Sequence, residues 1–227
     1  SSDLLLSQGA NLHVNAFDMS GEGGTPLIQA ARNGHAEVSL ELLRAGAVID
    51  DVELMFHHSA LMVAALNGHE KTAGLLLKAG ADPMLKDSSG RSALLLAATN
   101  NHLSVVIQLL DAGQKGDQKD SNGNGIWHLI AMSDVENEDS DSSYGSGQKE
   151  QSAAIIMHEL VTRGVLLDTL NSAGETALMI AVKRGKVKTL KILLELGASP
   201  DVQTPDGESA LTLAEASGKD ELVKLLR

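Results

Sequence analysis

The feature that most constrains this chain is a repeat with a period of about 33 residues. Six triplets align along the sequence, and their third residues are Leu27, Leu61, Leu94, Trp127, Leu178 and Leu211. Four of the five spacings between these residues are 33 or 34, and the fifth is 51. A chain made of repeated units of this length is expected to form a stack in which each unit contacts only its neighbours.

Each unit reads as two helices followed by a projecting turn. Ser or Thr opens five of the six triplets, where its hydroxyl can accept a hydrogen bond from an N–H group at the start of a helix. The first helix is then expected to end at a residue that tolerates the left-handed conformation, namely Gly34, Gly68, Asn101, Gly185 or Gly218. A second apolar segment follows, and it ends at Gly46, Gly80, Gly113, Gly164 or Gly197. The residues between units are rich in Asp, Gly and Pro, as in extended turns.

The period and the "TPL" motif at 25–27 are typical of ankyrin repeats. The segments "GGTPLIQAARNGHAEVSLELLRAGA" (23–47) and "GHEKTAGLLLKAGADP" (68–83) resemble this family closely. The resemblance covers nearly the whole chain and implies an all-α solenoid of stacked helix-turn-helix units with projecting β-turn loops, in a single domain spanning 1–227. The expected boundaries are a partial repeat at 1–16, repeats at 17–53, 54–86, 87–119, 120–170 and 171–203, and a truncated repeat at 204–227.

An acidic stretch, "DVENEDSDSSYGSGQKE" (134–150), lies inside the one long interval of the repeat. We therefore interpret it as an insertion into the fourth repeat, spanning 132–151, rather than as a linker between domains. Its composition predicts disorder. One hypothesis is a regulatory arm, phosphorylated at Ser140, Ser142 and Ser143, that screens the basic segment "VKRGKVKTLK" (182–191). The alternative is a solvated loop with no role.

Composition argues against several classes of function. The net charge of −12 disfavours nucleic-acid binding, which needs positive charge against phosphate. The sequence has no apolar run of about 18 residues, so no membrane insertion is expected. It contains no Cys and no recognisable signal peptide, which fits a cytoplasmic protein, with the nucleus as the alternative location. Because the chain opens at Ser1 rather than Met, we expect a module from a longer protein. We also expect this module to be monomeric.

No pattern of reactive side chains predicts a catalytic, cofactor or metal site. His35, His69 and His102 recur once per repeat, so they are not expected to converge on one ion, and the family resemblance gives this position a role in turn hydrogen bonding. The adjacent pair His57-His58 lacks the spacing of metal ligands. "GEGGT" (21–25) lacks the Lys of a phosphate-binding loop. We therefore expect no enzymatic activity.

The family resemblance implies a partner protein or peptide segment bound by the concave face and the projecting turns. Carried over by position, the candidate partner-binding residues are Met55, Phe56, His58, Leu66, Asn67, Arg91, Thr99, Asn100, Asn122, Asn124, Glu175, Lys183 and Arg184. Met55 and Phe56 are unusual because the other repeats have polar residues there. They either form an apolar binding site or fold back onto the stack. Trp127, in place of the usual Leu, is expected in the core. The alternative function is a regulatory or targeting arm of a larger enzyme or channel.

Overall fold

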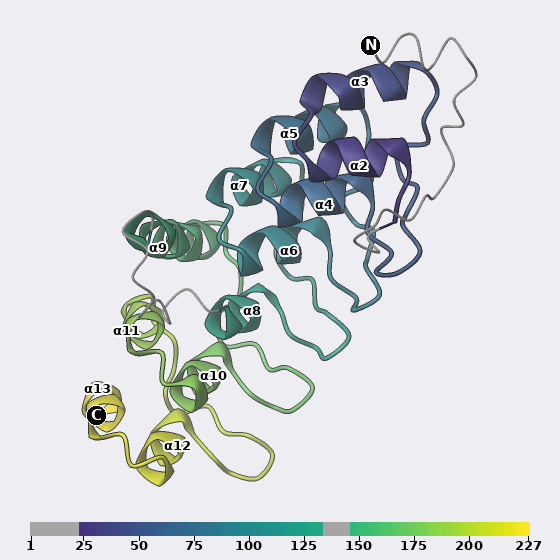
Figure 1. Cartoon of the computed structure of the whole chain (residues 1–227). Coiled ribbons are helices and arrows are strands. Elements are labelled where there is room, and N and C mark those ends of the chain that lie inside the picture. Colours follow the sequence, from purple (N-terminus) through teal and green to yellow (C-terminus); the bar gives the residue numbers. More distant parts are fainter. Residues whose placement is uncertain (1–22, 134–145) are drawn as a thin grey trace. The chain divides into compact units, whose positions relative to one another are not determined.

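The computed structural model describes residues 23–133 and 146–227, and for residues 146–152 it describes the helical backbone alone. Contacts between Cα atoms divide the chain into two compact units, residues 1–114 and 115–227. Within the described residues all regular structure is helical, apart from single β-bridges that close three of the projecting loops. The all-α repeat fold predicted from the sequence is confirmed (Figure 1).

In the part of the chain that the structure describes, both units consist of helices arranged in pairs, most of them short. Those of the first unit are α2 (Pro26–Arg32), α3 (Ala36–Arg44), α4 (Ala60–Leu66), α5 (Glu70–Lys78), α6 (Ala93–Thr99) and α7 (Leu103–Asp111). Those of the second unit are α8 (Ile126–Met132), α9 (Ser146–Thr162), α10 (Ala177–Arg184), α11 (Val187–Glu195), α12 (Ala210–Ala216) and α13 (Asp220–Leu226). A helix of seven to nine residues is marginal by itself, so these helices depend on packing against their neighbours.

The first helix of most repeats begins at the hydroxyl residue that the sequence indicates. The Thr25 hydroxyl accepts a hydrogen bond from the N–H of Ile28, and Pro26 occupies the first turn, where no N–H partner is needed. Side-chain caps of the same kind begin α4, α10 and α12. Ser92, at the start of α6, is the exception among the hydroxyl residues, because its side chain makes no cap bond.

In the first unit the helices pack in two rows (Figure 1). α4 packs against α2 and α6, while α5 packs against α3 and α7. Leu61, Leu76, Leu94 and Leu109 are completely or almost completely buried and form part of the core of this unit. Small Ala residues, such as Ala65 in α4, let the helices approach each other closely.

In the second unit α10 packs against α8, α11 and α12, and α12 packs against α13. Trp127 is 1% exposed, as expected from its place in the repeat, and so joins a core that also contains Leu178 and Leu193. The loops that follow the helix pairs project beside the first helices of each unit (Figure 1).

The recurring histidines of the first unit bridge successive repeats. The Nε2 of His69 lies 2.9 Å from the carbonyl oxygen of Arg32, and the Nε2 of His102 lies 3.0 Å from that of Leu66. A carbonyl oxygen can only accept, so each ring donates. The glycine at the end of α2, Gly34, has a φ of +70° and lies so close to the His69 ring that an added Cβ would be 2.7 Å from Nδ1. Each of these two rings therefore satisfies a carbonyl at the end of the preceding first helix.

The acidic insertion is partly helical, which corrects the expectation of disorder for its last residues. α9 spans Ser146–Thr162, seventeen residues, whereas α11 and the other second helices have at most nine. It therefore takes in the end of the insertion, which contains Gln, Lys and Glu, all good helix formers. Residues 134–145, including the proposed phosphorylation sites Ser140, Ser142 and Ser143, lie outside the described residues.

Candidate functional site

The loop between Val52 and Ser59 differs from the corresponding loops of the other repeats. From Glu53 to Ser59 it is one residue longer than the equivalent stretch from Asp87 to Ser92. Its tip carries Leu-Met-Phe (54–56), whereas the tips of the later repeats carry Ser-Ser, Ser-Asn, Ser-Ala or Pro-Asp. We call residues 54–56 the apolar tip.

The carboxylate of Glu53 holds the backbone of this loop. Its Oε2 accepts from the N–H of Met55 at 2.7 Å, and its Oε1 accepts from the N–H of Phe56 at 2.7 Å and of His58 at 3.3 Å. Asp87 binds its own loop in the same way, through the N–H groups of Ser89 and Arg91. The extra methylene of glutamate suits the longer loop, which explains why Glu53 stands where the next two repeats have Asp.

Two further features fix the apolar tip. His57 has a φ of +57° and takes the place that Gly90 and its equivalents occupy in the other loops. A histidine adopts this left-handed conformation more readily than most non-glycine residues. The carbonyl oxygen of Phe56 accepts from the N–H of Ser88 in the next loop at 2.8 Å. Hydrogen bonds with Glu53 of its own loop and with Ser88 of the next loop therefore fix the apolar tip.

The side chains of the apolar tip point outward. Leu54 is 60% exposed, Met55 53% and Phe56 46%. Of the two interpretations left open by the sequence, folding back onto the stack is therefore wrong. Three consecutive exposed apolar residues on a fixed backbone are unusual for a soluble surface, and such patches mark interaction sites.

Two candidate partner-binding residues do not lie on the surface. His58 and Asn124 are each only 5% exposed, so their predicted surface position is wrong. They occupy the same place in their loops as Arg91, which bonds the loop carboxylate of Asp87 through Nε at 2.8 Å. Asn124 likewise donates to Asp120, while His58 faces Glu53. The sequence signal is therefore a position four or five residues after the loop carboxylate, where the side chain bonds or faces that carboxylate.

The remaining candidates lie at or near the surface, and their part in binding stays a prediction. In the first unit, Asn67 and Asn100 are exposed, whereas Leu66, Arg91 and Thr99 are partly buried. In the second unit, Asn122, Lys183 and Arg184 are exposed and Glu175 is partly buried. The side chains of Asn67 and Asn100 each donate to a carbonyl of their own helix, which fixes their orientation.

In the second unit Glu175, Lys183 and Arg184 are held by hydrogen bonds. Lys183 donates to Oε1 of Glu175, and Arg184 donates to the carbonyl oxygen of Met132 at 2.9 Å. Burial acts to raise the pKa of Glu175, but the hydrogen bonds from Lys183 and Asn171 and the charge of Lys183 outweigh it, so the pKa is lowered. The exposed cations of this turn are therefore partly engaged within the fold.

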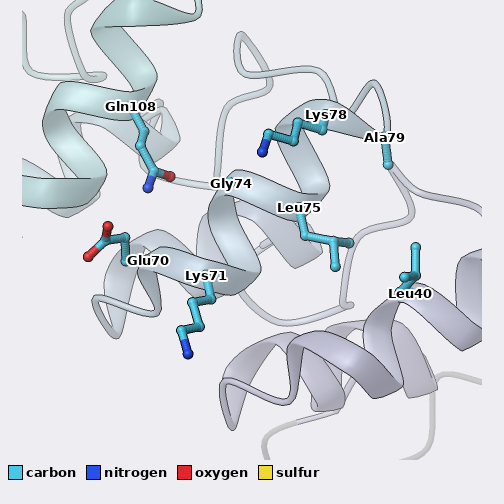
Figure 2. Close-up of a pocket in the computed structure, with 8 residues that line it drawn as sticks. All are labelled: Leu40, Glu70, Lys71, Gly74, Leu75, Lys78, Ala79 and Gln108. Carbon is cyan, nitrogen blue, oxygen red and sulfur yellow. The ribbon is translucent and has the colours of Figure 1, made fainter.

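A second surface feature lies on the other side of the first unit, between α3, α5 and α7. This feature is an open groove with a volume of about 600 Å³. Figure 2 shows the residues that line it: Leu40, Glu70, Lys71, Gly74, Leu75, Lys78, Ala79 and Gln108. Gly74 opens this groove, because an added Cβ would lie 3.1 Å from Oε1 of Gln108. That buried oxygen has no hydrogen-bond partner. The groove was not predicted from the sequence. The available signal was Gly74, a glycine inside a helical segment.

Within 23–133 and 146–227, no three His, Asp or Glu side chains are grouped so that they could hold a metal ion. Among the same residues, none of the helices has both the length and the apolar character needed to cross a membrane.

Comparisons with known proteins agree with this architecture. A family model described as "Ankyrin repeats (3 copies)" matches residues 2–87, 61–137 and 150–227. A putative ankyrin repeat-containing protein of Treponema pallidum is 39% identical over 70 residues, which is 30% of this chain and 24% of the relative. The inactive serine/threonine-protein kinase TEX14 of Bos taurus is 30% identical over 77 residues, 34% of this chain and 5% of the relative. The chain thus matches only a small part of each of these longer proteins.

Solved structures share the fold over most of the chain. An ankyrin repeat domain from Acinetobacter baumannii has a TM-score of 0.69 and 26% identity, with 88% of this chain and 95% of that chain covered. The ankyrin repeat domain of Bcl-3 has a TM-score of 0.72 and 23% identity, with 89% and 85% covered. A chain from the complex of the endopeptidase Bd0816 of Bdellovibrio bacteriovorus with immunity protein Bd3460 has a TM-score of 0.69 and 22% identity, with 89% and 97% covered.

Proposed function

The chain belongs to the ankyrin-repeat family, and on that premise we propose that it is a non-catalytic module that recruits a partner protein through its first helices and projecting loops. Ankyrin repeats are generally protein–protein interaction modules. Similar structures include Bcl-3, a member of the IκB protein family, and a chain from a complex between an endopeptidase and an immunity protein. The cytoplasmic or nuclear location and monomeric state expected from the sequence remain part of this proposal.

The apolar tip carries the proposal. Exposing Leu54, Met55 and Phe56 to water costs free energy in the isolated chain, and a partner that covers them recovers it. The bonds from Glu53 and Ser88 fix the backbone in advance, so little conformational entropy is lost on binding. Aromatic residues in such positions often contribute a large part of the binding free energy.

The first prediction concerns this tip. Partners are captured with the wild-type chain, identified by mass spectrometry, and titrated against the double variant Met55→Ser/Phe56→Ser. We expect the dissociation constant to rise about 30-fold or more, equivalent to about 2 kcal/mol. Folding of each variant is checked by circular dichroism.

Met84→Ser is the matched control, because Met84 is 54% exposed, almost the same as Met55, but lies outside the apolar tip. It should leave the affinity unchanged. A folded double variant that binds as tightly as the wild type would contradict the proposal.

The alternative function, a regulatory or targeting arm of a larger enzyme or channel, is favoured by one observation. The chain matches only 5% of the length of TEX14, so segments of this kind also occur within much longer proteins. Sequencing the full-length gene tests this alternative. Flanking catalytic or membrane-spanning sequence would support it.

A further inference from the structure

His58 lies buried beneath the apolar tip, between two carboxylates. Its Nδ1 is 3.8 Å from Oε1 of Glu53, and its Nε2 is 3.5 Å from Oδ2 of Asp87 in the next loop. Both carboxylates are themselves buried, Glu53 being 2% exposed and Asp87 6%. The charged groups that face the ring are these two and Arg91, which bonds Asp87.

A neutral imidazole cannot satisfy both carboxylates. It has one N–H donor and one acceptor nitrogen, whereas ionised carboxylate oxygens only accept. At 3.8 Å from Glu53 and 3.5 Å from Asp87, neither ring nitrogen of His58 is at an ordinary hydrogen-bonding distance, and the buried Nε2 has no hydrogen-bond partner. A protonated ring has two N–H donors, but its charge would have to leave water. Protonation of His58 therefore adds a hydrogen-bond donor but also places a positive charge in a buried site, which costs solvation free energy.

The ring of His58 is tied directly to the apolar tip. It stacks on the Phe56 ring, with 5.6 Å between the centroids and 27° between the planes. The N–H of His58 donates to Glu53, the same carboxylate that holds Met55 and Phe56. Any displacement of the ring towards water consequently removes the support beneath Phe56 and weakens the bonds that fix the tip.

Burial is the largest influence on the pKa of the His58 ring. It lowers the pKa of His58 below the ordinary value of 6.5, more than the nearby carboxylates of Asp87 and Glu53 raise it. In an open loop, where the ring meets water, the pKa returns towards 6.5. The open loop therefore binds the proton more tightly. The contribution of His58 to the free-energy difference that favours the closed loop has its full value above pH 6.5. It decreases as the pH falls towards the lower pKa of the closed loop.

We propose that His58 is a proton-sensitive latch, and that its protonation on mild acidification opens the loop 53–58 and disperses the apolar tip. The regulatory meaning of this latch rests on the proposed function, since loss of the tip would release a bound partner. The opening itself is a property of the chain alone and is measured without any partner.

Amide hydrogen exchange of the isolated chain tests the latch. The N–H groups of Met55, Phe56 and His58 are followed at about pH 7.5 and about pH 5.5, and each rate is divided by that of an unstructured peptide to give a protection factor. We expect protection of these three groups to fall on acidification by up to about tenfold, because about pH 5.5 lies one unit below the ordinary pKa of 6.5 that the ring approaches in the open loop.

Two variants separate His58 from other groups. His58→Gln removes the titrating ring and should abolish the pH dependence of protection in the loop. His57→Asn is the matched control, because His57 is exposed and adjacent, and asparagine tolerates its φ of +57°. This control should show the same pH dependence as the wild type. Equal protection at both pH values in the wild type, or an unchanged pH dependence in His58→Gln, would overturn the proposal.

A direct titration of the wild-type chain tests the latch even if the loop of the His58→Gln variant does not close. The ring protons of His58 are followed by NMR in the wild-type chain as the pH is lowered. We expect the midpoint for His58 to lie below the ordinary value of 6.5. A midpoint for His58 at or above 6.5 would refute the latch. Neither experiment involves a partner, so a failed latch and a failed partner-binding proposal give different results.

Discussion

At the scale of single residues, close contacts between glycines and ring side chains hold successive repeats together. Gly34 lies against the ring of His69, which is fixed by its bond to the carbonyl of Arg32. Gly46, at the end of the second helix of the same repeat, also has a positive φ, but an added Cβ there would meet no heavy atom within 4 Å. The two glycines therefore differ in their contacts much more than in their backbone strain.

This pair gives a prediction for stability. Gly46→Ala should lower the free energy of unfolding by about 1–2 kcal/mol, the cost of a left-handed conformation for a residue with a Cβ. Gly34→Ala should lower it further, because the new methyl group would displace a hydrogen-bonded ring. Urea denaturation followed by circular dichroism measures both values. Equal losses would show that the His69 ring moves away freely.

At the scale of helices, α5 has a glycine in its interior, which opens the groove of Figure 2. Glycine costs a helix interior about 0.5–1 kcal/mol relative to alanine. The atom that a new Cβ would approach is the end of the flexible Gln108 side chain, which can rotate away. The groove is therefore maintained at some expense of helix stability.

We accordingly expect Gly74→Ala to stabilise the chain by about 0.5–1 kcal/mol while partly filling the groove. Thermal unfolding followed by circular dichroism measures the change. The combination with Gln108→Ala serves as the control, since it removes the side chain whose atoms lie nearest to the new methyl group. A loss of stability in Gly74→Ala that disappears in the double variant would show that Gln108 cannot move.

The helices also show how much the sequence could predict. The period indicates all the first helices of the described residues, and hydroxyl caps together with left-handed Gly or Asn residues mark most of their ends, because each signal is local and is repeated. The beginning of α9 was missed, since the Gln, Lys, Glu and Ser residues at 146–151 are common both in helices and in disordered segments. The buried state of His58 was missed because the extra residue of its loop changes its spacing from the loop carboxylate Glu53, and because the second carboxylate that it faces, Asp87, belongs to the next repeat.

For the whole molecule, each of the two units has its own core. The only tryptophan of the chain, Trp127, belongs to the second unit and is buried there, so its fluorescence reports on that unit. Circular dichroism reports on the helices of both units. Leu76 in α5 and Leu193 in α11 occupy the same position in their helices, and both are buried.

These residues form a matched pair for a test. Leu76→Ala should cost about 2–5 kcal/mol within the first unit and lower the midpoint seen by circular dichroism, while the fluorescence midpoint stays in place. Leu193→Ala should lower both midpoints. If Leu76→Ala shifts fluorescence by as much as circular dichroism, the two cores unfold together, as in a strongly coupled stack.

The loop that carries the apolar tip has accepted an extra residue without disturbing the period around it. An insertion inside a helix would rotate every later side chain by about 100° and turn the core outward. Here the additional length is taken up between Glu53 and Ser59, and Leu61 stays buried in register with Leu27 and Leu94. Because Glu53 bonds three N–H groups of its own loop, the loop keeps a defined shape at its new length. Such a loop can evolve new lengths and compositions while the helices below it remain unchanged, so the surface at this position can diversify without loss of the fold.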